Sequence, residues 1–188
     1  RGPDSLGVAR LWRDIGGKGV LGNHEIHALL MASGHRNPPD AELSDFLSAP
    51  DGQELLSQMR NLPVLEYLPG EGRGPDVWAV HAGLKPQWKD LHGVSSQLNL
   101  SDHDDVWLTN DEVAFATQVR YCTASGDRTH FHGAPADCPA PYQPWDSFYH
   151  GDVLVVHGHW AQRGFYKGMK TMGLDSGCVY GGSLTAWC

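Results

Sequence analysis

The apolar and polar positions along the chain switch repeatedly between helical and strand periodicity. Apolar residues recur at three- and four-residue intervals in 6–14 and again in 24–32, which predicts two helices. Two shorter helices are expected in 42–59, broken around Pro50-Asp51-Gly52, and 105–119 is expected to be helical in part. Short apolar runs bounded by turn residues predict strands at 18–21, 63–68, 77–80, 152–156, 165–167, 172–174 and 184–188.

Three of these predicted strands end in a turn of small residues that carries histidine. The turns are Gly22-Asn23-His24, His81-Ala82-Gly83 and His157-Gly158-His159. Ligands of α/β proteins gather at the carboxyl ends of strands, and glycine lets the backbone approach a ligand closely. We therefore expect one composite site. Asn23, His81 and His159 would give it one amide oxygen and two imidazoles, which suit a divalent metal, although each alone is an ordinary hydrogen-bonded loop residue.

Composition narrows the class of protein. A chain of 188 residues with 40% hydrophobic content can build one domain with a sizeable core, and it contains no apolar run long enough to cross a membrane. Its net charge of −8 disfavours a nucleic-acid duplex as partner but not a small polyanion held by metal cations. The cysteines lack C-x-x-C spacing, which favours a reduced cytoplasmic protein with free thiols at Cys122, Cys138, Cys178 and Cys188.

A Cys/His group lies in the stretch between Cys122 and Trp145, which is rich in Gly, Pro, Ser and Asp and is expected to form a long surface loop. The spacing of Cys122, His130, His132 and Cys138 matches no standard zinc finger, so a solvated loop is favoured over a structural zinc site.

Several motifs occur in an order that resembles a known family. Gly22-Asn23-His24-Glu25, His81-Ala82-Gly83-Leu84 and Gly158-His159 look like the signatures of calcineurin-like metallophosphoesterases of the phosphoprotein-phosphatase type. Arg1-Gly2-Pro3-Asp4-Ser5 looks like the tail of their Gly-Asp-x-x-Asp-Arg-Gly motif. The chain most resembles the symmetrical bis(5′-nucleosyl)-tetraphosphatases of that superfamily, through 21–27, 36–38, 49–51, 81–88, 158–160 and 174–185.

The resemblance implies a fold and a set of site residues. The fold would be a layered α/β sandwich of two mixed β-sheets flanked by helices, forming a single domain over 1–188 that is truncated at both ends. Asn23, His81 and His159 would coordinate metal, and His24 would be the general acid that protonates the leaving phosphate oxygen. His159 is chosen over His157 because the resemblance places the ligand after the glycine. Substrate would be bound by Arg1, Arg120 and Tyr180.

The reaction implied by the resemblance is symmetrical hydrolysis of diadenosine tetraphosphate to two ADP. A metal-bridging hydroxide would attack in line, with two divalent cations as cofactors, Mn²⁺ or Co²⁺ first and Fe or Zn as alternatives. The partner would be a dinucleoside polyphosphate, with nucleoside-tetraphosphate-capped RNA ends as a further substrate.

The chain departs from the family pattern at its start. The first motif, Gly-Asp-x-His-Gly, is absent, as is the bridging aspartate expected just before Arg1. These residues would supply about half of the metal ligands, so the expected activity belongs to the complete protein. Two alternatives stay open: a Ser/Thr protein phosphatase of the same superfamily, and an inactive truncated binding module.

Overall fold

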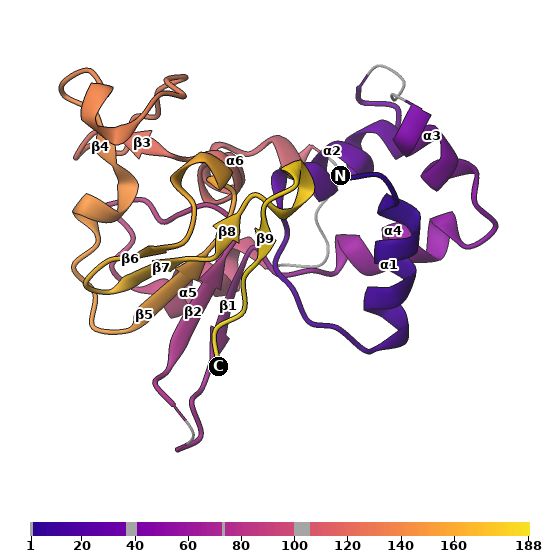
Figure 1. The fold of residues 1–188 in the computed structure, drawn as a ribbon, viewed down its shortest axis with the longest axis horizontal. Helices are drawn as coiled ribbons and strands as arrows, with labels where there is room; N and C mark the ends of the chain where they lie inside the picture. The colour runs from indigo at the N-terminus through magenta and orange to yellow at the C-terminus, as the bar shows by residue number, and fades with distance from the viewer. Residues whose placement is uncertain (1, 37–40, 73, 100–105) are drawn as a thin grey trace.

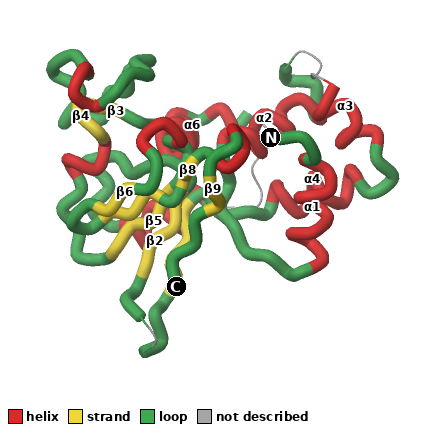
Figure 2. Tube along the Cα trace, in the orientation of Figure 1, coloured by secondary structure: helices red, strands yellow, loops and turns green. Residues whose placement is uncertain are grey.

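The computed structural model describes residues 2–36, 41–72, 74–99 and 106–188 and has an α/β fold. Four helices gather on one side of the molecule and a β-sheet forms the other side (Figure 1). Figure 2 shows the same division by secondary structure, with the strands confined to the second side. The four helices are α1 (Ser5–Asp14), α2 (Asn23–Ala32), α3 (Ala41–Ser48) and α4 (Gly52–Arg60), which follow the predicted helices closely.

The sheet has five strands in the order β1-β2-β5-β7-β6. The central strands β2, β5 and β7 run parallel, while the outer strands β1 and β6 pair antiparallel with their neighbours. The carboxyl ends of the three parallel strands therefore lie at one edge of the sheet. The strands are β1 (Leu65–Leu68), β2 (Val77–Val80), β5 (Leu154–His157), β6 (Tyr166–Lys167) and β7 (Thr171–Gly173).

Smaller elements complete the fold. Helix α5 packs on β1, and α6 packs against α2 and so joins the helical side to the sheet side. Two short antiparallel pairs, β3 with β4 and β8 with β9, stand apart from the main sheet. These elements are α5 (Leu91–Leu98), α6 (Asp111–Gln118), β3 (Tyr121–Cys122), β4 (Gln143–Pro144), β8 (Asp175–Ser176) and β9 (Ser183–Leu184). Single 3₁₀ turns are η1 (Trp107–Thr109), η2 (Pro135–Asp137), η3 (Trp145–Phe148), η4 (Ala161–Arg163) and η5 (Cys178–Tyr180).

The fold confirms the predicted α/β class, but the strands are arranged differently from the expected pair of layered sheets. Among the described residues there is one five-stranded mixed sheet, with two antiparallel pairs beside it. The predicted strand at 18–21 is extended but joins no ladder in the described part of the chain, and its Leu21 N–H donates to the Pro63 carbonyl at 2.7 Å. The predicted strand at 184–188 is also shorter, because only Ser183–Leu184 pairs.

The long stretch between Cys122 and Trp145 is not entirely a surface loop, because both of its ends are fully buried. Trp145 belongs to the same buried core cluster as Val113 and Phe115 of α6. The residues between Cys122 and Trp145 are largely exposed. In the described part of the chain, no helix is long and apolar enough to cross a lipid bilayer.

Candidate active site

Asn23 and His81 meet at the start of α2. Gly22 is the N-cap residue of α2, and its N–H donates to the Glu25 carboxylate at 3.1 Å. Asn23 therefore begins the first turn, and its Oδ1 lies 2.9 Å from His81 Nε2. His81 directly follows β2, so this contact joins the helical side of the molecule to the sheet edge. The site begins at this junction.

Burial keeps the His81 imidazole neutral. Desolvation lowers the pKa of His81 to about 4, and the charges of His24 and His157 act in the same direction. The nearby Glu25 carboxylate opposes this pKa shift but does not overcome it. At pH 7 the His81 ring is therefore neutral, which is the state in which imidazole can coordinate a metal.

His159 follows β5 and completes the histidine pair. Its ring centroid lies 5.2 Å from that of His81. The loops are tied together by the Gly158 N–H, which donates to the His81 carbonyl at 2.9 Å. His159 adopts a φ of 65°, a left-handed conformation that is uncommon for a residue with a side chain and is often found at functional sites.

The tautomer of His159 follows from its hydrogen bond. His159 Nε2 lies 3.1 Å from the Gln118 carbonyl, which can only accept, so Nε2 carries the proton. Desolvation lowers the pKa of His159 to about 3, assisted by the charges of His81 and Arg120. The ring is therefore neutral with its lone pair on Nδ1. A histidine fixed in this way by a backbone carbonyl is a common arrangement among metal ligands.

His24 lies beside this pair. Its side chain is exposed, and its charge lowers the pKa of both His81 and His159. His24 and His81 also line the same cavity. The structure thus brings together the three predicted metal ligands and the predicted general acid.

Arg120 and Tyr180 approach the site from two further segments. Burial lowers the pKa of the half-buried Arg120, and the charges of Tyr180, Tyr121 and Asp175 oppose that shift. Arg120 also acts on the pKa of His159, so these groups share one region. Tyr180 ends the η5 turn and is 69% exposed. Arg1, the remaining predicted substrate ligand, lies outside the described residues.

The donor set fits a divalent cation in part. One amide oxygen and two neutral imidazoles are donors that Mn²⁺, Co²⁺, Fe²⁺ and Zn²⁺ accept. With bonds of about 2.0–2.2 Å, two neighbouring ligand atoms on one cation lie about 3 Å apart, close to the 2.9 Å between Asn23 Oδ1 and His81 Nε2. No group of three or more His, Cys, Asp or Glu side chains suited to a metal occurs in the described residues. Three donors alone leave coordination positions open for further ligands.

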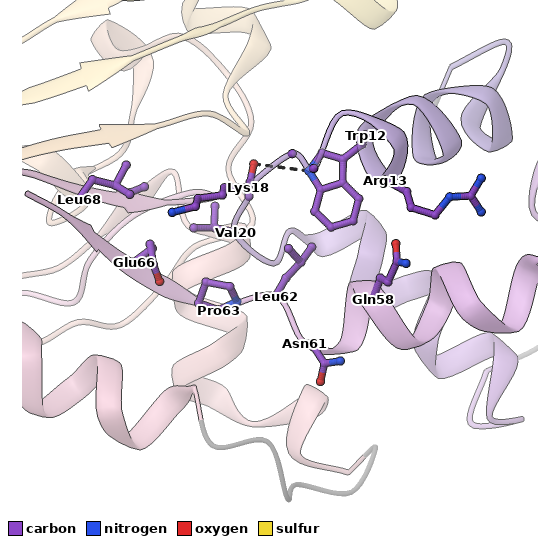
Figure 3. A pocket seen from close by; sticks show the side chains of 14 residues that line it. Trp12, Arg13, Lys18, Val20, Gln58, Asn61, Leu62, Pro63, Glu66 and Leu68 are labelled. Carbon is purple, nitrogen blue, oxygen red and sulfur yellow. Dashed lines mark hydrogen bonds between the residues drawn. The ribbon is translucent and has the colours of Figure 1, made fainter.

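Two cavities flank segment 18–20, and only one reaches the histidines. The larger, of about 640 Å³, is lined by Trp12, Asn61 and Glu66 and contains none of the predicted site residues. In Figure 3 the Trp12 Nε1–H donates to the Lys18 carbonyl within the wall of this cavity, at 3.5 Å. The second cavity, of about 560 Å³, includes His24 and His81 in its wall. The candidate site therefore borders the second cavity through His24 and His81, whereas Asn23, His159 and Arg120 are not among the residues that line it.

Several supporting groups were not singled out by the sequence. The Gln118 carbonyl orients His159, the Glu25 carboxylate fixes the N-cap residue of α2, and His132 accepts a hydrogen bond from Arg120. The capping-box spacing of Gly22 and Glu25 was the one signal available in the sequence. The other two contacts join segments that are distant in the chain.

The structure also places the remaining histidine and cysteine candidates. His157 is buried at the end of β5, with its ring 5.2 Å from that of Trp145, so it faces the core rather than the site. No metal cluster forms in the Cys/His stretch as far as the structure describes it. Cys122 is buried and all four cysteines carry free thiols.

Known proteins are similar to the chain over most of its length. No protein-family model matches the chain. The symmetrical bis(5′-nucleosyl)-tetraphosphatase of Burkholderia thailandensis is 34% identical over a 218-residue alignment that covers 99% of this chain and 75% of the relative. Proteins of the same name from Burkholderia mallei and Burkholderia pseudomallei match with the same identity and coverage. A crystal structure of a candidate diadenosine tetraphosphatase is 30% identical, with a TM-score of 0.64 over 96% of this chain and 68% of the other. The chain therefore belongs to the family of symmetrical bis(5′-nucleosyl)-tetraphosphatases.

Proposed function

We propose that the protein hydrolyses diadenosine tetraphosphate symmetrically to two ADP, with divalent cations held in part by Asn23, His81 and His159. The observation that carries the proposal is the convergence of these three side chains from separate segments of the chain, with Asn23 Oδ1 2.9 Å from His81 Nε2 and the two imidazole rings 5.2 Å apart. The names of the similar proteins indicate the substrate.

Each residue of the site has a distinct task. The low pKa values of His81 and His159 keep both rings unprotonated at neutral pH, so they can bind a cation without first losing a proton. His24 donates a proton from its imidazolium to the leaving phosphate oxygen, which makes ADP a better leaving group. Arg120 and Tyr180, with Arg1, bind the phosphate oxygens and orient the chain of four phosphates. The cations, when bound, neutralise phosphoryl charge and lower the pKa of the attacking water.

The wider setting is part of the same proposal. We propose Mn²⁺ or Co²⁺ as the cofactor pair, with Fe or Zn as alternatives, because imidazole and amide oxygen donors suit all four. RNA ends capped with a nucleoside tetraphosphate carry the same phosphate chain and are a further proposed substrate. The free thiols support a cytoplasmic location.

The test is turnover of diadenosine tetraphosphate by the full-length protein in Mn²⁺, with products separated by chromatography. ADP as sole product supports the proposal, whereas AMP with ATP, or hydrolysis of a phosphopeptide in its place, overturns it. His24→Ala should lower kcat by about 10²–10⁴-fold with metal content unchanged, because it removes only proton donation. Asn23→Ala should instead lower metal content. Equal loss of metal in both variants would contradict the assigned roles.

A further inference from the structure

Arg120 makes a directed hydrogen bond to a histidine of the long loop. Its Nη1 lies 2.7 Å from His132 Nδ1. A guanidinium has only donors, so His132 must accept at Nδ1 and carry its own proton at Nε2. His132 therefore bonds to Arg120 as a neutral imidazole of defined tautomer.

The loop around His132 is fixed to the strand that follows Arg120. The buried Tyr121, in β3, donates its hydroxyl to the Gly133 carbonyl at 2.7 Å, and its ring lies 5.3 Å from that of Phe131. The two neighbours of His132 are thus both attached to Tyr121. A side chain on Gly133 would come within 2.4 Å of the Phe131 ring, which explains why glycine allows the loop to fold so tightly here. His132 is held above Arg120 by these contacts.

The guanidinium keeps donors for a ligand. An arginine has five N–H donors, and the hydrogen bond to His132 is the one that its guanidinium makes within the described residues. The backbone of Arg120 is fixed as well, because its carbonyl accepts from the Trp145 N–H at 3.0 Å. A guanidinium held at one nitrogen can present the others as a fork, and this geometry matches two oxygens of a phosphate group.

We propose that His132 is a positioning residue that orients the Arg120 guanidinium toward the substrate phosphates, an inference that rests on the proposed function. Without the acceptor at Nδ1, the long side chain of Arg120 would sample other rotamers, and binding would have to order it anew. The effect should fall on substrate binding rather than on proton transfer or metal content.

The test compares two replacements of His132. His132→Leu removes the acceptor and should raise KM for diadenosine tetraphosphate about three- to tenfold with little change in kcat, the range of one net hydrogen bond. His132→Asn keeps an acceptor at a position close to Nδ1 and should restore most of the loss. His130→Leu, at an exposed histidine of the same loop, is the matched control and should leave KM unchanged.

A double-mutant cycle separates positioning from a general effect on the loop. In an Arg120→Ala background, His132→Leu should have no further effect on KM, because His132 acts through Arg120. Additive losses, or no rescue by Asn, would overturn the proposal.

Binding of inorganic pyrophosphate, measured by calorimetry, distinguishes failure of this inference from failure of the proposed function. The inference expects weaker binding in His132→Leu whether or not diadenosine tetraphosphate is turned over. Unchanged affinity, or no binding by the wild type, would overturn the inference by itself.

Discussion

The protonation states in the site are set by burial more than by any charged neighbour. His81 and His159 each have a pKa lowered first by desolvation, while Glu25 and the Gln118 carbonyl push the other way. A carboxylate close to His81 is therefore compatible with a neutral ring. This balance lets two imidazoles stand side by side at pH 7 without the repulsion that two imidazolium groups would create.

Gly22 occupies a position with no room for a side chain. A Cβ there would lie 2.5 Å from Glu25 Oε2 and 2.7 Å from His81 Nδ1. Gly22→Ala should therefore push the carboxylate and the ring apart. We expect it to destabilise the protein by about 1–3 kcal/mol. It should also weaken Mn²⁺ binding, because His81 moves relative to Asn23. Urea unfolding and a metal titration measure the two effects.

The control is Gly74→Ala, since a Cβ at Gly74 has nothing within 4 Å. That variant should stay within about 0.5 kcal/mol of the wild type. If Gly22→Ala behaved like Gly74→Ala in both measurements, the close packing of Gly22 on His81 would not matter for the site.

The cysteines should differ sharply in reactivity. Burial raises the pKa of Cys122 to about 12 and its side chain is fully enclosed, whereas Cys178 and Cys188 are exposed. With a disulfide reagent at pH 8, Cys178 and Cys188 should react in the fast phase and Cys122 only after denaturation. Mass spectrometry of the modified peptides identifies each thiol. Rapid modification of Cys122 in the folded protein would contradict the burial of the β3 strand.

At the scale of elements, one carboxylate ties two helices together. Asp51, at the N-cap of α4, accepts from Arg10 at 2.6 and 2.9 Å and from Arg13 at 3.0 Å, and both arginines lie on α1. The hydrogen bond from Arg10 is the largest cause that holds the pKa of Asp51 well below its usual range. The ionised carboxylate is thus favoured by folding.

Asp51→Asn should lower the melting temperature at pH 7 by about 2–4 °C. The stability from a lowered carboxyl pKa is fully present above the unfolded-state pKa of about 4 and is lost as pH falls through the folded-state value. The difference in melting temperature between Asp51→Asn and the wild type should therefore shrink below about pH 4. Melting curves at pH 7 and pH 3 test this. The control is Asp14→Asn, which removes the charge of a more exposed partner of Arg13. Its melting temperature should differ little from that of the wild type at either pH.

Local sequence pattern predicted the elements that carry their own periodicity. The helices α1 and α2 and the strands β2 and β5 follow from apolar spacing, and their ends place Asn23, His81 and His159. Segment 18–21 has the composition of a strand, but a strand also needs a partner, which no local pattern encodes. Helix α5 gave no clear pattern because Gly93 and two serines weaken it; its start is fixed by Asp90, whose side chain accepts from the Gly93 N–H at 3.1 Å.

For the whole molecule, the core explains why a loop-rich chain holds the site together. Trp145 is fully buried although it follows the long loop, and its ring lies 5.2 Å from that of His157 at the end of β5. Gly83, two residues after His81, packs so closely on it that a Cβ would come within 2.6 Å of the indole. This tertiary packing could not be predicted from residues around Trp145, which are those of a surface loop. One side chain thus supports two of the three segments that carry predicted ligands.

Trp145→Ala should therefore affect both stability and the site. Removing a fully buried indole is expected to cost about 3–5 kcal/mol, since the surrounding structure can refill the space only in part. The loops after β2 and β5 lose a common support, so the affinity for Mn²⁺ should fall in the fraction that stays folded. Urea unfolding and metal titration on the same sample measure both. Trp187→Ala, at a tryptophan that is 42% exposed, should cost much less and leave metal affinity unchanged. If Trp145→Ala lost much stability but kept its metal affinity, the indole would not be needed to position the loops after β2 and β5. Contacts such as the hydrogen bond from the Gly158 N–H to the His81 carbonyl would then be enough to hold these loops in place.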